Sequence, residues 1–266
     1  MTQGRTNIII AVVILIIMFG VYLMTAAPTI STWDCGEFVT CAYIMGIPHP
    51  PGSPLLSLVG RVMSIMPFSD YRDLNIDHFY SPVAYRVTMI DVILAALTVM
   101  LTYLIMVKLI HRFRPYRGSR LEESIVMFSA AVTAFLVGFS DEFWTNAVEI
   151  ETYMPSLFLS MMAVWFVLHW TERKDNPGTV RYLFLAAYLI GLGNGVHPTV
   201  LLIAPTAFAL VVFARPDWFL DVRLLVWSGV MVVAFGLIKM FGGLELLYAV
   251  MALFAFVVPV MLYKMS

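Results

Sequence analysis

The sequence contains few charged residues: Asp, Glu, Lys and Arg together make up 12% of its 266 positions. Soluble globular domains carry about 25% charged residues, and disordered chains have low hydrophobicity, so both classes are excluded. The formal net charge of −1 provides no basic field for a nucleic acid. Only 2 cysteines are present, too few for a disulfide framework. What the chain does contain is 61% hydrophobic residues with a mean hydropathy of +0.89, which indicates a polytopic membrane protein.

Long apolar runs recur along the chain. A membrane-crossing helix needs about 20 mostly apolar residues. The runs lack the alternation of a membrane β-barrel, so the predicted fold class is all-α. About eight transmembrane helices are expected, near residues 8–25, 87–108, 124–140, 154–170, 182–195, 198–214, 224–241 and 245–263. A helix break is expected between the fifth and sixth, where Gly193, Asn194, Gly195 and Pro198 cluster.

Basic residues are distributed unevenly between alternate loops. If the N-terminus is cytoplasmic, 12 of the 16 Lys and Arg residues fall on the cytoplasmic side, as the positive-inside rule requires. The same assignment places 11 of the 17 acids on the outer side. The first span is expected to be a retained anchor, because Pro28 would follow the signal-peptidase site at Ala27. The acidic outer side is not part of the positive-inside rule and needs its own explanation.

The stretch 26–86 is expected to be a structured first outer loop. Within it, Pro54 opens a segment in which apolar residues recur every three or four positions from 55 to 66. This pattern is typical of an amphipathic helix lying flat at the membrane surface. It is equally consistent with a short helix packed on the end of the bundle.

Two acids lie close together in this loop, Asp34 and Glu37, within the sequence Trp-Asp-Cys-Gly-Glu. One interpretation is a helix start in which Asp34 is the N-cap and Glu37 its capping partner. The other is a carboxylate pair at the mouth of a membrane cavity, where one acid acts as a base and the other orients it or binds a cation. The two interpretations are compatible.

A second outer loop is expected at 141–153. It contains four acids together with Trp144 and Tyr153; the acids are Asp141, Glu142, Glu149 and Glu151. Aromatic anchoring at the interface and solvated charge would explain the pattern. Alternatively, the loop forms a second acidic patch facing the first loop, and its carboxylates would suit Mg²⁺ or Mn²⁺.

Two further residues stand at the outer ends of predicted spans. Arg86 either extends to the lipid headgroups or clamps a lipid phosphate, for which its planar donors are well suited. Asp91 is a candidate ion-pair partner for it. His197 lies at the predicted helix break, where backbone in membranes often lines a cavity. A structural role is the alternative for His197.

Several motifs occur in a recognisable order. They are Ala27–Glu37 (A-P-T-I-S-T-W-D-C-G-E), His49–Leu55 (H-P-P-G-S-P-L), Gly60-Arg61, Ala84–Val87 (A-Y-R-V), Phe143–Tyr153 (F-W-x-x-A-V-E-x-E-x-Y) and Gly191–Thr199 (G-L-x-x-G-V-H-P-T). This series resembles the bacterial membrane family related to protein O-mannosyltransferases, in the glycosyltransferase C superfamily. The match extends to about residue 215, and the W-D-C-G-E and H-P-P-G pair is its most specific part.

The resemblance implies a glycosyltransferase C-type helix bundle with an essential acid in the first outer loop. Carried onto this chain, it implies that Asp34 is the general base, that Glu37 assists it and that Arg86 grips the donor phosphate. Further substrate or cation contacts are expected at His49, Arg61, Asp141, Glu142, Glu149, Tyr153 and His197. The metal is left open, and Mg²⁺ or Mn²⁺ is the candidate cofactor.

The expected function is transfer of mannose or a similar hexose from a polyprenyl-phosphate donor to a Ser or Thr hydroxyl of a translocated protein, with inversion. A glycan is a further possible acceptor. Residues 1–266 are expected to form one module in the bacterial inner membrane, with an extracytoplasmic active site and no C-terminal soluble region. The alternatives are a secondary transporter, for which intramembrane Asp91 and His197 would suit ion coupling, and a noncatalytic assembly partner.

Overall fold

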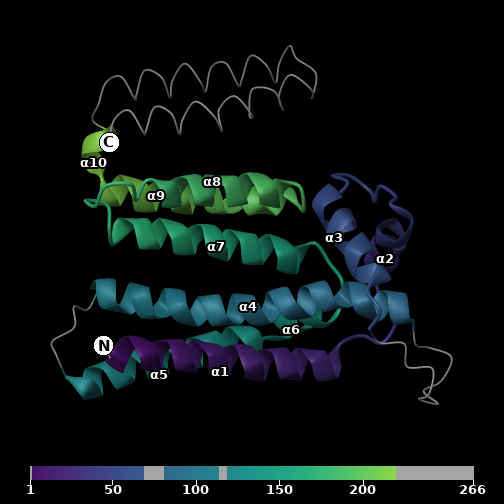
Figure 1. Cartoon of the computed structure of the whole chain (residues 1–266), viewed down its shortest axis with the longest axis horizontal. Coiled ribbons are helices and arrows are strands. Elements are labelled where there is room, and N and C mark those ends of the chain that lie inside the picture. Colours follow the sequence, from purple (N-terminus) through teal and green to yellow (C-terminus); the bar gives the residue numbers. More distant parts are fainter. Residues whose placement is uncertain (1, 69–80, 114–118, 220–266) are drawn as a thin grey trace, which may run out of the picture. The chain divides into compact units, whose positions relative to one another are not determined.

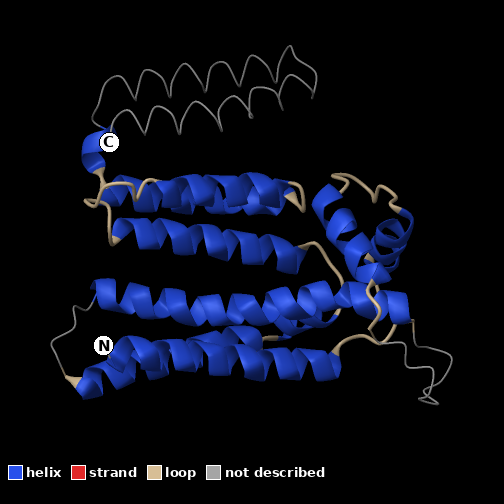
Figure 2. Ribbon diagram, in the orientation of Figure 1, coloured by secondary structure: helices blue, strands red, loops and turns tan. Residues whose placement is uncertain are grey.

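The computed structural model describes residues 2–68, 81–113 and 119–219. Within these ranges the chain forms helices joined by short loops and no strand, so the all-α prediction is confirmed (Figures 1 and 2). The chain divides into two compact units. The described residues of the first unit lie within 2–162 and 191–201, and those of the second lie within 163–190 and 202–219.

In the described part of the chain, four helices are long and apolar enough to cross a membrane. They are α1 (Thr2–Thr25), α4 (Pro82–Phe113), α5 (Arg120–Gly138) and α7 (Tyr153–Thr171), so a helix of sufficient length is confirmed at each of the first four predicted spans.

The remaining predicted spans are not established. The fifth corresponds to α8 (Arg181–Asn194), whose 14 residues extend about 21 Å, less than the ~30 Å of hydrocarbon. The sixth is divided into the 3-10 helix η1 (Pro198–Ile203) and α9 (Ala204–Ala214). The predicted spans 224–241 and 245–263 lie outside the described residues, so the expected total of about eight stays a prediction.

The core of the first unit is built on α4. A stripe of α1 containing Ala11, Ile14, Met18 and Tyr22 is buried in this core, while Ile16 on another face is exposed. The spacing of the stripe is that of one helix face. A largely apolar helix with a single buried stripe is suited to a position between protein and lipid.

The predicted outer loops lie at one end of the first unit. Figure 1 shows α1 ending, α4 beginning and α5 ending at the same end, where α2, α3 and α6 also lie. Hydrogen bonds join these segments: the Ala27 N–H donates to Val148 O at 2.8 Å, and the Ser81 N–H donates to Pro28 O at 3.0 Å. The first and second predicted loops therefore meet.

The first loop contains a helical hairpin of α2 (Cys35–Ile44) and α3 (Pro54–Ile65). The predicted helix at 55–66 is confirmed, and it packs on both α2 and α4. Its buried side holds small and polar residues, including Ser57, Gly60 and Ser64. Its apolar side is exposed; Leu58, Val59, Val62 and Ile65 lie there. The helix therefore packs on the bundle and also exposes its apolar face. The exposed apolar face favours contact with lipid.

The segment 141–153, predicted as the second outer loop, contains a short helix in its first half. Helix α6 (Asp141–Val148) follows Ser140, and its first turn carries Asp141 and Glu142. Acids in a first turn are favoured by the helix dipole. The predicted break at 193–198 is confirmed, because α8 ends at Asn194 and η1 begins at Pro198.

The second unit has a small core of its own. Ala163 and Val167 of α7, Ala186 of α8 and Ala207 of α9 are its buried apolar residues. At one end, the Trp170 ring lies 5.5 Å from the Trp218 ring of α10 (Pro216–Phe219). The small residues allow the helices to approach closely, as in other membrane bundles.

Candidate functional site

Asp34 occupies the N-cap position of α2, but no capping box forms there. Its carbonyl accepts the Phe38 N–H at 3.0 Å, while its side chain makes no capping hydrogen bond. The Glu37 carboxylate does not return to the helix start either. The capping-box interpretation was therefore wrong, and the reason is that Glu37 has another partner.

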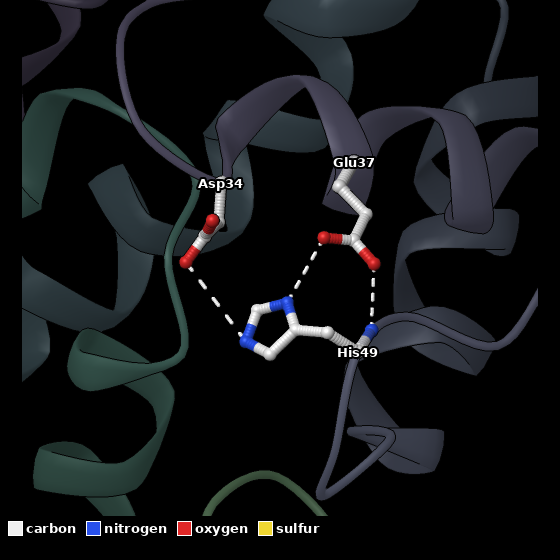
Figure 3. A group of neighbouring side chains, drawn as sticks. All are labelled: Asp34, Glu37 and His49. Carbon is white, nitrogen blue, oxygen red and sulfur yellow. Dashed lines mark hydrogen bonds and ion pairs between the residues drawn. The ribbon is translucent and has the colours of Figure 1, made fainter.

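That partner is His49, in the loop after α2. Glu37 Oε1 accepts the His49 backbone N–H at 2.6 Å, and Glu37 Oε2 lies 2.9 Å from His49 Nδ1. The other ring nitrogen, Nε2, lies 3.9 Å from Asp34 Oδ2. Figure 3 shows the His49 ring lying between the two carboxylates. Glu37 thus acts on Asp34 through His49 rather than directly.

The local chain geometry holds His49 in this position. Its ring packs at 5.8 Å from the ring of Phe38, which is buried one turn into α2. The Gly52 N–H closes a turn onto His49 O at 2.9 Å, with a φ of 92° that suits glycine. On the other side, Trp33 adopts a φ of 56° directly before Asp34. Backbone strain in non-glycine residues is concentrated at functional sites.

Glu37 and His49 stabilise each other's charged forms. The hydrogen bonds from His49 lower the pKa of Glu37, and the hydrogen bond to Glu37 raises the pKa of His49. Nearby Asp34 and Glu151 raise the pKa of His49 further. The side chains of Asp34 and His49 are 53% and 46% exposed, so a substrate can reach both.

Glu151, predicted only as one of the four acids of the second outer loop, lies next to the site. It is only 7% exposed. Burial raises its pKa to about 7, and the neighbouring carboxylates of Asp34 and Glu149 act in the same direction, while His49 opposes them. Its occurrence with Glu149 in one Glu-x-Glu segment was the only signal in the sequence.

Asp91 holds the Glu151 segment in place. It is fully buried in α4, and its Oδ2 accepts the Glu151 N–H at 2.7 Å. The predicted ion pair between Asp91 and Arg86 is wrong, because a separation of five residues places the two side chains on different faces of a helix. Arg86 instead donates to Phe68 O at 2.7 Å and to Ser64 O at 3.2 Å. Among the described residues, no hydrogen bond or ion pair joins Arg86 to Asp34, Glu37 or His49.

The acids of the second loop separate into two kinds. Asp141 and Glu142 are exposed at the start of α6, as solvated charges would be. Glu149 is buried and accepts the Ser31 hydroxyl at 2.6 Å, which joins the second loop to the first. The predicted acidic patch facing the first loop is therefore found at Glu149 and Glu151, and not at Asp141 and Glu142.

The other predicted contacts have local partners. Arg61 donates to Tyr43 O at 2.5 Å in the last turn of α2, where a positive charge interacts favourably with the helix dipole. The His197 ring lies 6.0 Å from the Tyr153 ring, and its Nδ1 accepts the Thr199 N–H at 3.3 Å. These contacts support the structural interpretation of His197.

Asp34, Glu37 and His49 are thus the predicted residues that the structure brings together. Each offers a ligand atom, and these atoms lie within 4.8 Å of one another. Two carboxylates and an imidazole are donors that can remove a proton or hold a divalent cation. The fold and this cluster define a helical membrane-type protein with an accessible acid-histidine group at one end of its first unit.

Comparison with known proteins gives the family. The model for "Protein O-mannosyl-transferase TMEM260 N-terminal domain" matches residues 34–219, so the chain belongs to this family. A curated relative, "Protein O-mannosyl-transferase tmem260" of Dictyostelium discoideum, is 23% identical over 216 residues, or 77% of this chain. The chain spans only 23% of the length of that relative. No solved structure matches the present chain. The resemblance to the wider O-mannosyltransferase family is confirmed, while a bacterial origin stays a prediction.

Proposed function

We propose that the chain is the membrane part of a glycosyltransferase that moves a hexose such as mannose from a polyprenyl-phosphate to a Ser or Thr hydroxyl of a translocated protein. The observation that carries the proposal is the accessible Asp34 carboxylate, held beside His49 at the end of the bundle where the two loops meet. The family membership supports the same reaction class, because the relative is named as an O-mannosyltransferase.

In this mechanism Asp34 is the general base. It removes the proton from the acceptor hydroxyl, and the oxygen attacks the anomeric carbon of the sugar. The bond between that carbon and the phosphate oxygen breaks with inversion, and the polyprenyl phosphate leaves with the bonding electrons. Asp34 then releases its proton to water. A phosphate is already a good leaving group, so stabilisation of its developing charge helps more than a strong acid.

Other residues have supporting roles in the proposal. Glu37 fixes the orientation of His49, which in turn faces Asp34 Oδ2. Arg86 remains the proposed donor-phosphate residue, although its contacts with Ser64 and Phe68 carbonyls also fix the end of α3. In the proposal the chain crosses a membrane with its N-terminus in the cytoplasm. The end of the first unit that carries Asp34 then faces the extracytoplasmic side.

The proposal is tested by sugar transfer in proteoliposomes that contain the chain, a labelled polyprenyl-phosphate hexose and a Ser/Thr-rich acceptor peptide. Asp34→Asn keeps the size of the side chain and removes its basicity. We expect it to reduce transfer by about 10²–10⁴-fold, the contribution of a positioned base. The parent chain should transfer sugar only when the lipid-linked donor is present.

The matched control is Asp175→Asn, the same chemical change on an aspartate that is 82% exposed and pairs only loosely with Arg215 at 4.0 Å. This variant should transfer sugar at the parent rate. If the Asp34→Asn and Asp175→Asn chains are equally active, Asp34 is not the base. If the parent transfers no sugar from any polyprenyl-phosphate donor, the reaction class itself is wrong.

A further inference from the structure

We propose that Asp34 and His49 bind one divalent transition-metal ion, of the Zn²⁺ or Mn²⁺ kind, and that Glu37 is the residue that orients His49 for this role. The proposal concerns the site that the proposed function assigns to Asp34, but ion binding is a property of the chain that can be measured without a sugar donor.

The first support is the direction of the His49 ring. Glu37 Oε2 lies 2.9 Å from Nδ1, and an ionised carboxylate can only accept a hydrogen bond. The proton of a neutral His49 is therefore on Nδ1, and its lone pair is on Nε2, toward Asp34. Histidines that bind metals are held in this way, with one ring nitrogen donating to a carboxylate and the other on the metal.

The second support is the distance between Nε2 and Asp34 Oδ2. At 3.9 Å it is too long for a hydrogen bond, which needs about 2.7–3.2 Å. Zn²⁺ lies about 2.0–2.2 Å from nitrogen and carboxylate oxygen ligands. The 3.9 Å separation therefore leaves room for one ion bound to both atoms.

The third support is the excess of negative charge. Two carboxylates, those of Asp34 and Glu37, flank the single His49 ring, at 3.9 Å and 2.9 Å from its two nitrogens. No Lys or Arg in the described ranges forms an ion pair with either of these two acids. A divalent cation would balance this charge.

The donor set decides which ion is favoured. Carboxylates alone would suit Mg²⁺ or Mn²⁺, the ions expected from the sequence. The structure adds an imidazole, which favours transition metals and does not suit Mg²⁺. In the proposed reaction the ion would stabilise negative charge beside Asp34, whose Oδ1 is left for the acceptor hydroxyl.

The test is a Mn²⁺ titration followed by electron paramagnetic resonance, with Zn²⁺ as the competitor. The chain is purified in detergent without a histidine tag and stripped of metal with a chelator. We expect one Mn²⁺ per chain, displaced by Zn²⁺ but not by a tenfold excess of Mg²⁺. His49→Gln should weaken binding at least tenfold, and Glu37→Gln by about 10–100-fold, as for other residues that orient a ligand.

The matched control is His111→Gln. His111 Nε2 lies 3.0 Å from Glu123, so this is a His–carboxylate pair of the same kind, and no second acid among the described residues pairs with the ring. It should leave Mn²⁺ binding unchanged, and metal-free thermal unfolding of each variant checks that it is folded. The proposal is overturned if the parent binds no stoichiometric Mn²⁺, if the His49 and His111 variants bind alike, or if Mg²⁺ displaces Mn²⁺ equally well.

Discussion

The spacing of Asp34 and Glu37 does not by itself reveal the role of the two acids. Three residues of separation fit a capping box and a functional pair equally well, so the sequence left both open. His49 decides between them, because Glu37 bonds to it at two points and leaves the helix start uncapped. His49 is 12 residues from Glu37, and its approach depends on the turn that ends at Gly52. A non-local contact of this kind is not encoded in residue spacing.

Glu151 gives a pH-dependent prediction. Its ordinary pKa of 4.5 rises to about 7 in the folded chain because of burial. Between these values the unfolded chain loses the proton and the folded chain keeps it, so the stability contributed by this residue falls as pH rises and is fully lost above about 7. Glu151→Gln should therefore raise the unfolding temperature relative to the parent at pH 8, by roughly 2–4 °C per kcal/mol, with a smaller gain at pH 5.

The measurement is thermal unfolding in detergent at the two pH values. Glu142→Gln, at the exposed start of α6, is the control and should give the same small difference from the parent at both. An equal effect of Glu151→Gln at pH 5 and pH 8 would contradict the assignment of a buried, neutral carboxyl at this position.

At the scale of elements, the α2–α3 hairpin positions the site. Glu37 belongs to α2 and His49 to the loop between the two helices, so the hairpin must be closely packed to hold them together. The contact depends on Gly60 of α3, where an added Cβ would lie 2.7 Å from the Cβ of Ala42 in α2. Periodicity predicted the helix at 55–66, but not that its small residues would face inward.

Gly60→Ala is predicted to force α2 and α3 apart. Overpacking of this kind destabilises by about 1–3 kcal/mol, and a lower unfolding temperature should report it. Gly20→Ala is the matched control, since an added Cβ in α1 meets no atom within 4 Å. That change should be neutral or slightly stabilising, because alanine is the better helix former. Equal tolerance of both substitutions would show that the close α2–α3 contact is not required.

At the scale of the whole molecule, hydropathy correctly predicted the helices at the first four expected spans and the break before Pro198. Such features depend on length and composition within one segment. The second acidic loop was less predictable, because its two ends differ in burial. Glu149 and Glu151 are buried, whereas Asp141 and Glu142 are exposed. Burial of a carboxylate depends on which segments of the chain pack against it. Glu149 contacts Ser31 and the Glu151 N–H contacts Asp91, and both partners are distant in the sequence.

The central claim is that Asp34 faces the sugar of a lipid-linked donor. The most direct measurement is an experimental map of the chain in a lipid nanodisc with a non-hydrolysable polyprenyl-phosphate hexose bound. The account predicts that the Asp34 carboxylate is the acid nearest the anomeric carbon, on the side opposite the phosphate. A donor seated at the other end of the first unit, or an Asp34 carboxylate turned away from the hexose with another acid in its place, would contradict it.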